Sequence, residues 1–255
     1  PDDRQDRSSP WAVEQIYMAH FTITNIQEED FRFYERLERG AADLAGAEAD
    51  PFYQVWLGDW SVEQLDSTTY HLLASADGLR LDLVLDDQKG VVLQGDNGYS
   101  RKGDLPGNAS YYYSLTDMHT QGTLDWLGEE FIVQGKSWMD HEFSTSALAP
   151  EQIGWDWFAL HLSDGSELMV YTVRRKDGSI DPLSTGTMID PEGNIQSLQR
   201  QDFEIDVLTT WRSPHSGGVY PAEWAVRVPS ENLYLEVTPV IPDQELMLSF
   251  VYWEG

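Results

Sequence analysis

The chain has 255 residues, 41% hydrophobic and 12% aromatic, which is enough apolar material for one large or two ordinary folded domains. Its formal net charge is −28 and it has only 16 Lys and Arg residues, which argues against binding to nucleic acid or to anionic lipid surfaces. It has no cysteine, so disulfides and thiolate metal sites are excluded. No apolar run approaches the roughly 20 residues of a membrane helix. The sequence begins at Pro1 without a recognisable signal peptide, so we expect a processed or trimmed leading segment.

The first two predicted elements differ in type. Residues 13–25 (VEQIYMAHFTITN) alternate in polarity and predict a strand with Phe21 on one face and His20 on the other. A hydrogen-bonded structural role is favoured for His20, and a place in a ligand pocket is the alternative. Residues 28–39 carry acids first and bases later, which suits the dipole of a short helix that ends at Gly40.

Short strands separated by turns account for most of the remaining chain. Asp77-Gly78 and Asp164-Gly165 are hairpin signals, and the glycine-rich residues 95–108 predict a long loop. A spacing of about ten residues per strand and turn predicts an all-β sandwich or barrel with at most one or two short helices. The small, proline-bearing break at residues 148–151 is the best boundary between two units. The expected strands are 52–57, 62–65, 70–76, 79–85, 91–93, 111–114, 123–127, 131–134, 155–162, 167–174, 186–190, 195–198, 203–211, 222–228, 233–240 and 246–253.

Residues 135–143 (GKSWMDHEF) gather more chemistry than any other stretch. If they are extended, Trp138, Asp140 and Glu142 share one face, and His141 lies on the other with its two apolar neighbours. Two acids beside an indole in a pocket favour a protonated carboxyl group, which is how a general acid arises. A strand edge whose acids face water is the alternative.

Aromatic residues nearby supply further candidates. Tyr111, Tyr112 and Tyr113 put hydroxyl groups on both faces of one strand, although aromatic strand formers are also favoured there on propensity alone. In the run WDWF, Asp156 stands beside Trp157. That acid either lines a ligand cavity or lies on the outer face between two core tryptophans, and the outer face is favoured.

Several catalytic and metal motifs are missing. The sequence has no HExxH, EF-hand loop, GxSxG elbow or phosphate-binding loop, and we predict no metal and no cofactor. The remaining acids, histidines and tyrosines lie amid aromatic residues. They suit proton transfer to an apolar ligand, or ligand binding alone in the mouth of a barrel.

Seven runs together resemble one bacterial family: YMAHFTITN, VWLGDWS, GDNGYSRKG, SYYYS, GKSWMDHEFSTS, GWDWFALHLSDGSELMVY and DPLSTGT. They are similar to the AttH-like family of secreted hydrolases, which is grouped with the carotenoid 1,2-hydratases (hydroxyneurosporene synthases). The resemblance covers nearly the whole chain. It implies two tandem lipocalin-like antiparallel β-barrels, at residues 1–149 and 150–255. The first barrel is expected to lack its opening strands and the second a closing strand, which would leave an unpaired or borrowed edge.

The resemblance also implies a function. An aromatic-x-Asp motif of the hydratases falls on Trp138-Met139-Asp140, with Trp in place of Tyr, and their upstream His-x-Trp pair falls near the three tyrosines, where this chain has no histidine. We expect a periplasmic or secreted protein whose partner is a large apolar molecule of isoprenoid or polyketide type, and no nucleic acid. A hydratase, lyase or cyclase is one hypothesis. A non-catalytic carrier, or an accessory protein of a membrane-associated export system, is the alternative.

In the enzyme hypothesis, Asp140 protonates an alkene, and the like charge of Glu142 keeps Asp140 protonated. Trp138 and Tyr112 stabilise the positive charge that develops. We expect Asp140 inside the first barrel or at its junction with the second, within reach of a tyrosine or of His20. The predicted catalytic residues are Asp140, Glu142 and Tyr112, and the predicted ligand-binding residues are His20, Tyr111, Tyr113, Trp138, His141 and Trp157.

Overall fold

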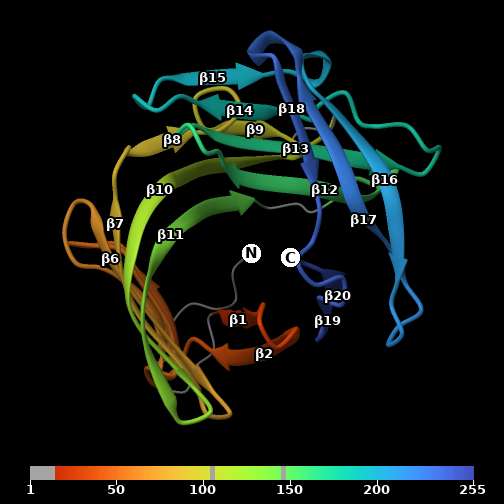
Figure 1. Ribbon diagram of the computed structural model, residues 1–255. Helices are drawn as coiled ribbons and strands as arrows, with labels where there is room; N and C mark the ends of the chain where they lie inside the picture. The colour runs from red at the N-terminus through yellow and green to blue at the C-terminus, as the bar shows by residue number, and fades with distance from the viewer. Residues whose placement is uncertain (1–14, 104–106, 145–147) are drawn as a thin grey trace, which may run out of the picture.

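A computed structural model of the protein describes residues 15–103, 107–144 and 148–255. In these residues the fold consists of twenty strands, all paired antiparallel, and two single-turn 3-10 helices, η1 (Arg200–Asp202) and η2 (Pro229–Glu231). The all-β prediction with at most one or two short helices is confirmed, and Figure 1 shows how the strands are arranged.

The strands before residue 145 form a hairpin and one large sheet. The hairpin pairs β1 (Ile16–Asn25) with β2 (Asp30–Arg39). The sheet has nine strands in the order β11-β10-β7-β6-β5-β4-β3, with β8 and β9 also paired to β10. Its strands are β3 (Ala45–Glu48), β4 (Gln54–Leu57), β5 (Trp60–Gln64), β6 (Thr69–Ala76), β7 (Leu79–Asp87), β8 (Val91–Leu93), β9 (Tyr99–Arg101), β10 (Ala109–Trp126) and β11 (Glu129–Ser144).

The strands after residue 148 form three smaller sheets. None of them is paired to a strand of the first half in the described residues, although the division into domains near residue 150 stays a prediction. The sheets are β12 (Gln152–His161), β13 (Glu167–Arg175), β14 (Gly186–Ile189) and β15 (Ile195–Leu198); β16 (Glu204–Arg212), β17 (Val219–Val228) and β18 (Leu233–Val237); and β19 (Glu245–Met247) with β20 (Val251–Trp253).

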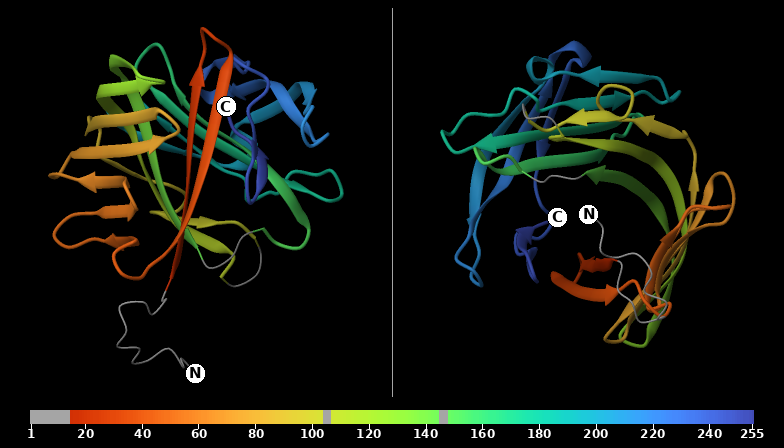
Figure 2. Two further views of the ribbon diagram at one scale, coloured as in Figure 1. Left: turned by 90° about the horizontal axis from the view of Figure 1, so that it is seen from below. Right: turned by 180° about the vertical axis from the view of Figure 1, so that it is seen from behind.

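The long strands β10 and β11 carry the chain from one half to the other. One end of β10 pairs with β7, and beyond a break in register between Leu115 and Met118 the other end pairs with β8 and β9. A bulge of this kind bends a strand and re-aims its side chains. Figures 1 and 2 show β10 and β11 curving from the β3–β7 strands up to β12 and β13.

The segment predicted as a short helix, residues 28–39, is instead the strand β2, so that prediction is wrong. Its alternate side chains pack on the first half of the molecule: Arg36 lies over the ring of Trp60 at 4.3 Å, and Tyr34 stacks on Phe21. The acid-to-base order favours a helix only weakly. Pairing with β1 and burial of alternate residues outweigh it.

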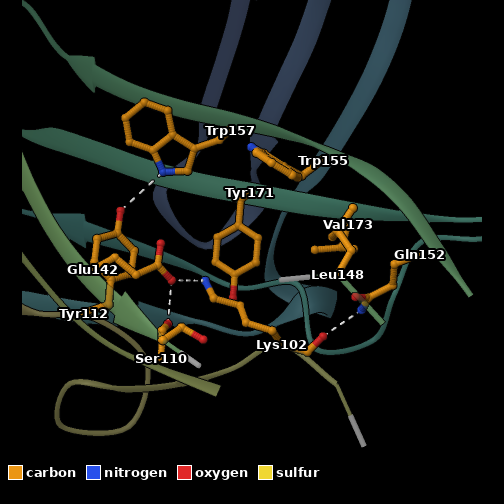
Figure 3. Close-up of a pocket in the computed structure, with 11 residues that line it drawn as sticks. Lys102, Ser110, Tyr112, Glu142, Leu148, Gln152, Trp155, Trp157, Tyr171 and Val173 are labelled. Atoms are coloured by element: carbon orange, nitrogen blue, oxygen red, sulfur yellow. Dashed lines mark hydrogen bonds and ion pairs between the residues drawn. The ribbon is translucent and has the colours of Figure 1, made fainter. Parts of the chain in front are cut away.

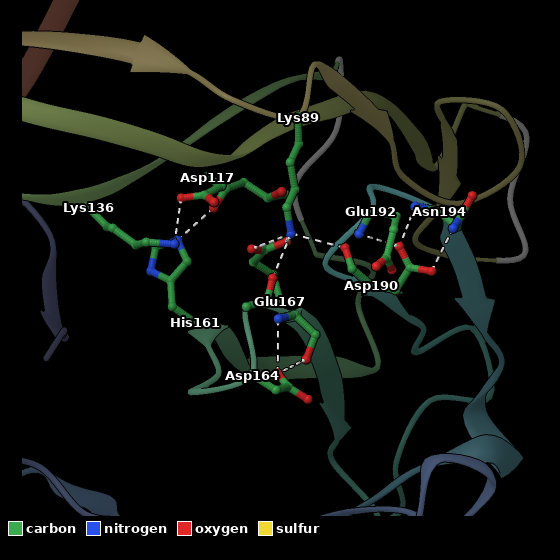
Figure 4. A network of polar contacts seen from close by, with 12 residues as sticks. Lys89, Asp117, Lys136, His161, Asp164, Glu167, Asp190, Glu192 and Asn194 are labelled. Carbon is green, nitrogen blue, oxygen red and sulfur yellow. Dashed lines mark hydrogen bonds and ion pairs between the residues drawn. The ribbon is translucent and has the colours of Figure 1, made fainter.

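A buried ion pair joins the two halves (Figure 4). Lys89, in the turn between β7 and β8, donates to both carboxylate oxygens of Glu167 at 2.8 Å and to the backbone oxygens of Gly165 and Asp190. The side chains of Lys89 and Glu167 are 9% and 1% exposed. This contact fixes how the first sheet sits on β13 and β14.

The two ends of the described chain also meet. One face of hairpin β1–β2 packs on the first sheet through Phe21, and the other face meets the C-terminal segment. Figure 2 shows the hairpin lying between the β3–β7 strands and β19–β20. In the described residues β1 and β2 pair only with each other, and so do β19 and β20. The single strand predicted at residues 246–253 is instead divided between β19 and β20.

Candidate functional site

The face of β10 and β11 that points toward the second half carries the residues singled out in the sequence. The register of the two strands sets Tyr112 opposite Glu142 and Ser114 opposite Asp140. Trp138, two residues before Asp140, shares this face, as strand alternation predicted. Tyr112 and Trp138 pack against β13 through Tyr171 and its neighbours. Asp140 thus lies at the contact between the two halves, as expected.

Three donors converge on one oxygen of Asp140. Its Oδ1 accepts hydrogen bonds from the hydroxyl of Tyr112 at 2.9 Å, from Oγ of Ser114 at 2.5 Å and from Nε1 of Trp138 at 3.0 Å. Ser114 in turn accepts from the buried Gln94. The side chain of Asp140 is nevertheless exposed, so solvent reaches the carboxyl group. Asp140 is therefore held in place yet open to water and to a ligand.

Beside this carboxyl group lies a pocket of about 320 Å³ (Figure 3). Aromatic and aliphatic side chains from β12 and β13 form one wall, and polar groups from β10, β11 and the 102 region form the other. Its lining residues are Lys102, Ser110, Tyr112, Glu142, Ser144, Leu148, Gln152, Trp155, Trp157, Tyr171 and Val173. We call this the junction pocket.

A lysine neutralises the second predicted acid. Lys102 Nζ lies 2.8 Å from Oε1 of Glu142, which also accepts from Ser110. The same ammonium lies 4.4 Å from the ring centre of Tyr171 and 5.4 Å from that of Tyr112, within the range of cation–π attraction. This ion pair weakens the expected repulsion between Glu142 and Asp140, and the catalytic role of Glu142 stays a prediction.

Tyr112 links the pocket to Asp140. Only 4% of Tyr112 is exposed, and burial raises the pKa of its phenol, with the negative charge of Asp140 acting in the same direction. Its hydroxyl donates to Asp140 and accepts from Nε1 of Trp157 at 3.3 Å. Tyr112 therefore stays protonated and serves as a fixed donor to Asp140.

Three of the predicted ligand-binding residues lie on the opposite face of β10 and β11. Tyr111 pairs with Phe143 and Tyr113 with His141, and strand alternation turns all of them away from the junction pocket. His141 Nδ1 lies 2.8 Å from the hydroxyl of Tyr113, and burial lowers the pKa of its imidazole. Tyr111, Tyr113 and His141 therefore do not line the junction pocket, and a ligand-binding role for them stays a prediction.

His20 also lies elsewhere. Its ring nitrogens are 2.6 Å from the hydroxyl of Tyr252 and 3.0 Å from a carboxylate oxygen of Glu35. The tyrosine that reaches Asp140 is Tyr112, so His20 does not supply that contact. Of the predicted ligand-binding residues, Trp157 lines the junction pocket and Trp138 bonds to Asp140 beside it.

Sequence reasoning missed several residues of the pocket. Lys102 lies in the segment 95–108, which was predicted to be a long loop. That segment contains the short strand β9, and Lys102 follows this strand directly. Tyr171 comes from a distant strand, and only the three-dimensional packing places it here. Asp156 was expected on the outer face between core tryptophans. Its side chain is instead only 11% exposed, and Trp155 and Trp157 are more exposed, at 59% and 41%.

Two negative findings apply to the described residues. Within residues 15–103, 107–144 and 148–255, no group of three or more acids and histidines is arranged to hold a metal ion. Over the same residues, no helix is long and apolar enough to cross a membrane.

Comparison with known proteins identifies relatives of the chain. A family model described as AttH-like matches residues 1–255. The crystal structure of an AttH from Nitrosomonas europaea superposes with a TM-score of 0.87 at 30% sequence identity, covering 96% of this chain and 77% of that one. Kievitone hydratase from Nectria haematococca superposes with a TM-score of 0.71 at 17% identity, covering 92% of this chain and 69% of that one. No curated protein sequence matches this chain.

Proposed function

This chain belongs to the AttH-like family, and we propose that it binds an apolar small molecule in the junction pocket and adds water to a carbon–carbon double bond, or removes water from an alcohol to form one. One observation carries the proposal. The carboxyl group of Asp140 receives three hydrogen bonds on a single oxygen while its side chain stays exposed beside an aromatic-walled pocket.

In this proposal Asp140 exchanges a proton with the ligand. Tyr112, Ser114 and Trp138 donate to Oδ1, so they orient the carboxyl group and leave Oδ2 to face the ligand. Hydration begins when an acid adds a proton to one alkene carbon and leaves a cation on the other. Water then attacks the cation, and the carboxylate recovers a proton from the bound water. Solvent exposure at Asp140 supplies that water.

The aromatic walls suit the cationic intermediate. Trp157 and Tyr171 line the pocket and Trp138 bonds to Asp140, and an aromatic face attracts a desolvated cation by about 2 kcal/mol. The lysine at the pocket, Lys102, is already paired with Glu142, so it adds no net charge that would oppose a cation.

The pocket limits the size of the ligand. A volume of about 320 Å³ is near the lower end of the range for drug-sized molecules. We therefore propose a compact unsaturated ligand, or one unsaturated end of a longer isoprenoid or polyketide. The shared fold with kievitone hydratase supports the proposal only as an analogy, because 17% identity establishes the fold alone.

Binding without chemistry is the second candidate, and the Lys102–Glu142 ion pair favours it. The predicted second acid is tied to a cation, so the site holds one free carboxyl group rather than two. An exported carrier, or an accessory protein of an export system, needs only the apolar walls of the pocket. The two candidates differ in whether the ligand leaves chemically changed.

Labelled water and a wall variant test the proposal. Compact unsaturated isoprenoids and kievitone are incubated with the protein in ¹⁸O-labelled water, and products are analysed by mass spectrometry. We expect an alcohol carrying one labelled oxygen, and binding that weakens at least tenfold in Trp157→Ala. The matched control is Trp211→Ala, because Trp211 stacks on Tyr220 outside the pocket. Binding without label incorporation would favour the carrier. Equal binding by both variants would contradict the site.

A further inference from the structure

A second cavity, of about 430 Å³, adjoins strand β12. Asp156 and Phe158, which alternation turns to the opposite side of the strand from Trp155 and Trp157, line this cavity. Trp155 and Trp157 line both this cavity and the junction pocket. The remaining walls come from β17, from the end of β18 and from residues 252–255. We call it the C-terminal cavity.

A neutralised acid lines the C-terminal cavity. The side chain of Asp156 is 11% exposed, and its Oδ1 accepts a hydrogen bond from Nη1 of Arg174 at 2.7 Å. Burial raises the pKa of this carboxyl group, although the charge and the hydrogen bond of Arg174 lower it in part. The surroundings of Asp156 are therefore poorly hydrated. Because Arg174 balances its charge, Asp156 offers a hydrogen-bond acceptor without calling for a ligand cation.

Trp224, which also lines this cavity, carries an unused donor. Trp224 is 95% buried, since only 5% of it is exposed, and its Nε1 has no hydrogen-bond acceptor among the described residues. Its ring packs edge-on against Phe158 at 5.3 Å and beside Trp253 at 6.0 Å. A buried N–H without an acceptor costs about 1–3 kcal/mol. An acceptor atom on a ligand would remove that cost.

The rim of the cavity is held rigid. Tyr252 lines it, and its hydroxyl lies 2.6 Å from Nδ1 of His20, whose other nitrogen lies 3.0 Å from Glu35. This chain of contacts ties the C-terminal strand β20 to hairpin β1–β2. A wall fixed in advance loses less conformational entropy when a ligand binds. His20 thus acts here as a positioning residue for Tyr252.

We propose that the C-terminal cavity is a second binding site, specific for a neutral aromatic or alicyclic alcohol. The hydroxyl group donates to Asp156 and supplies the acceptor that Trp224 lacks, while the apolar body packs against Phe158, Trp224 and Trp253. A carboxylate ligand has no hydrogen to donate to Asp156. An ammonium ligand would compete with Arg174, which already pairs with that acid. The site does not depend on the reaction proposed for the junction pocket.

Three probes of one shape test the choice of ligand. 2-Naphthol, naphthalene and 2-naphthoate are titrated into the purified protein by isothermal titration calorimetry. We expect 2-naphthol to bind at least tenfold more tightly than either of the others. Trp224→Phe keeps the packing and removes the N–H, so it should weaken 2-naphthol by about three- to tenfold and leave naphthalene unchanged.

Cavity-filling variants locate the bound probe. Val240 lines the C-terminal cavity and is 63% exposed, so Val240→Trp should fold and abolish 2-naphthol binding there. Val207→Trp, at a 46% exposed position on β16, is the matched control and should bind like wild type. Leu148→Trp narrows only the junction pocket and should leave this binding intact.

Three results would overturn the proposal. The first is no saturable binding of 2-naphthol. The second is equal affinity for 2-naphthol and naphthalene. The third is binding lost in Leu148→Trp and kept in Val240→Trp, which would place the probe in the junction pocket. Since none of these readouts uses turnover, a failure here is distinguishable from a failure of the hydratase proposal.

Discussion

Two carboxyl groups at the contact between the halves differ in how completely they are bonded. Glu167 is 1% exposed, and both of its oxygens face Lys89 at 2.8 Å (Figure 4). Asp140 is exposed, and the hydrogen bonds it accepts from the described residues all end on Oδ1. Both carboxylate oxygens of Glu167 are therefore occupied by a partner within the protein. In Asp140 the hydroxyl and indole donors occupy one oxygen, Oδ1.

The difference indicates a difference in role. A buried carboxylate that is fully paired with a lysine fixes the geometry of two sheets but has no oxygen free for chemistry. A carboxyl group held by neutral hydroxyl and indole donors keeps its position without a fixed counter-ion, as the proposed proton transfer requires. The junction therefore holds one structural contact and one that we propose to be reactive.

The largest expected effect comes from breaking the structural contact. Lys89→Met leaves the charge of Glu167 buried without a partner, which should lower the free energy of unfolding by about 3–5 kcal/mol. Urea denaturation measures the change. The double variant Lys89→Met, Glu167→Leu should recover most of the loss, because no buried charge remains.

An exposed ion pair gives the control for that experiment. Arg80→Met removes the partner of Asp82, where the two side chains are 51% and 37% exposed, and should cost below about 1 kcal/mol. Equal losses in Lys89→Met and Arg80→Met would show that the Lys89–Glu167 contact contributes no more than a surface pair.

A smaller effect on stability is expected at the reactive contact. Tyr112→Phe keeps the ring and removes one of the three hydrogen bonds to Asp140, so the protein should lose about 1 kcal/mol of stability. Turnover should fall by about ten- to hundredfold, since a hydrogen bond to a charged group is worth about 1.5–3 kcal/mol. A large loss of stability with unchanged turnover would make Tyr112 a structural residue like Lys89.

The smallest expected effect on stability concerns a third acid, Asp59. It accepts several hydrogen bonds, as Glu167 does, but it is exposed, as Asp140 is. Hydrogen bonds from Arg36 and Ser75 lower the pKa of Asp59 from its usual 3.8 to about 2. A lowered pKa in the folded state stabilises the protein above pH 3.8, and the contribution is lost as the pH falls through about 2. Asp59 is 62% exposed, so the gain stays below about 1 kcal/mol.

The measurement is the melting temperature of wild type and Asp59→Asn between pH 2 and pH 6. The wild type should melt higher near pH 6, and the two curves should converge as the pH approaches 2. A difference that grows toward low pH would have the wrong sign.

Strand alternation allowed the sequence to predict most strands and also which side chains share a face with Asp140. Strand alternation is a local property, so it placed Asp140 and Trp138 on one face before any packing was known. It could not tell which face of β12 is interior, because both its faces line cavities, and Asp156 was therefore assigned to the wrong side. Strand β2 was missed because its pairing with β1 is tertiary, whereas the charge order that suggested a helix is local.

Lys102 and Tyr171 escaped prediction for a different reason. Each reaches the pocket from a segment far from the 135–143 stretch, and no spacing in the sequence records that approach. The Lys102–Glu142 ion pair in turn weakens the repulsion expected between Glu142 and Asp140. Long-range pairing thus decided the electrostatics of a site of which the sequence had shown only a part.

The most direct test of the reactive role is Asp140→Asn. The amide keeps the shape of the side chain and can still accept from Tyr112 and Ser114, but it cannot carry a proton. We predict that label incorporation from ¹⁸O-water falls by about 10²- to 10⁴-fold, while ligand affinity and melting temperature stay close to those of wild type. Glu129→Gln, on the same strand, should match wild type in all three. A lowered melting temperature with turnover retained would show that Asp140 is structural, as Glu167 is, and would contradict the account.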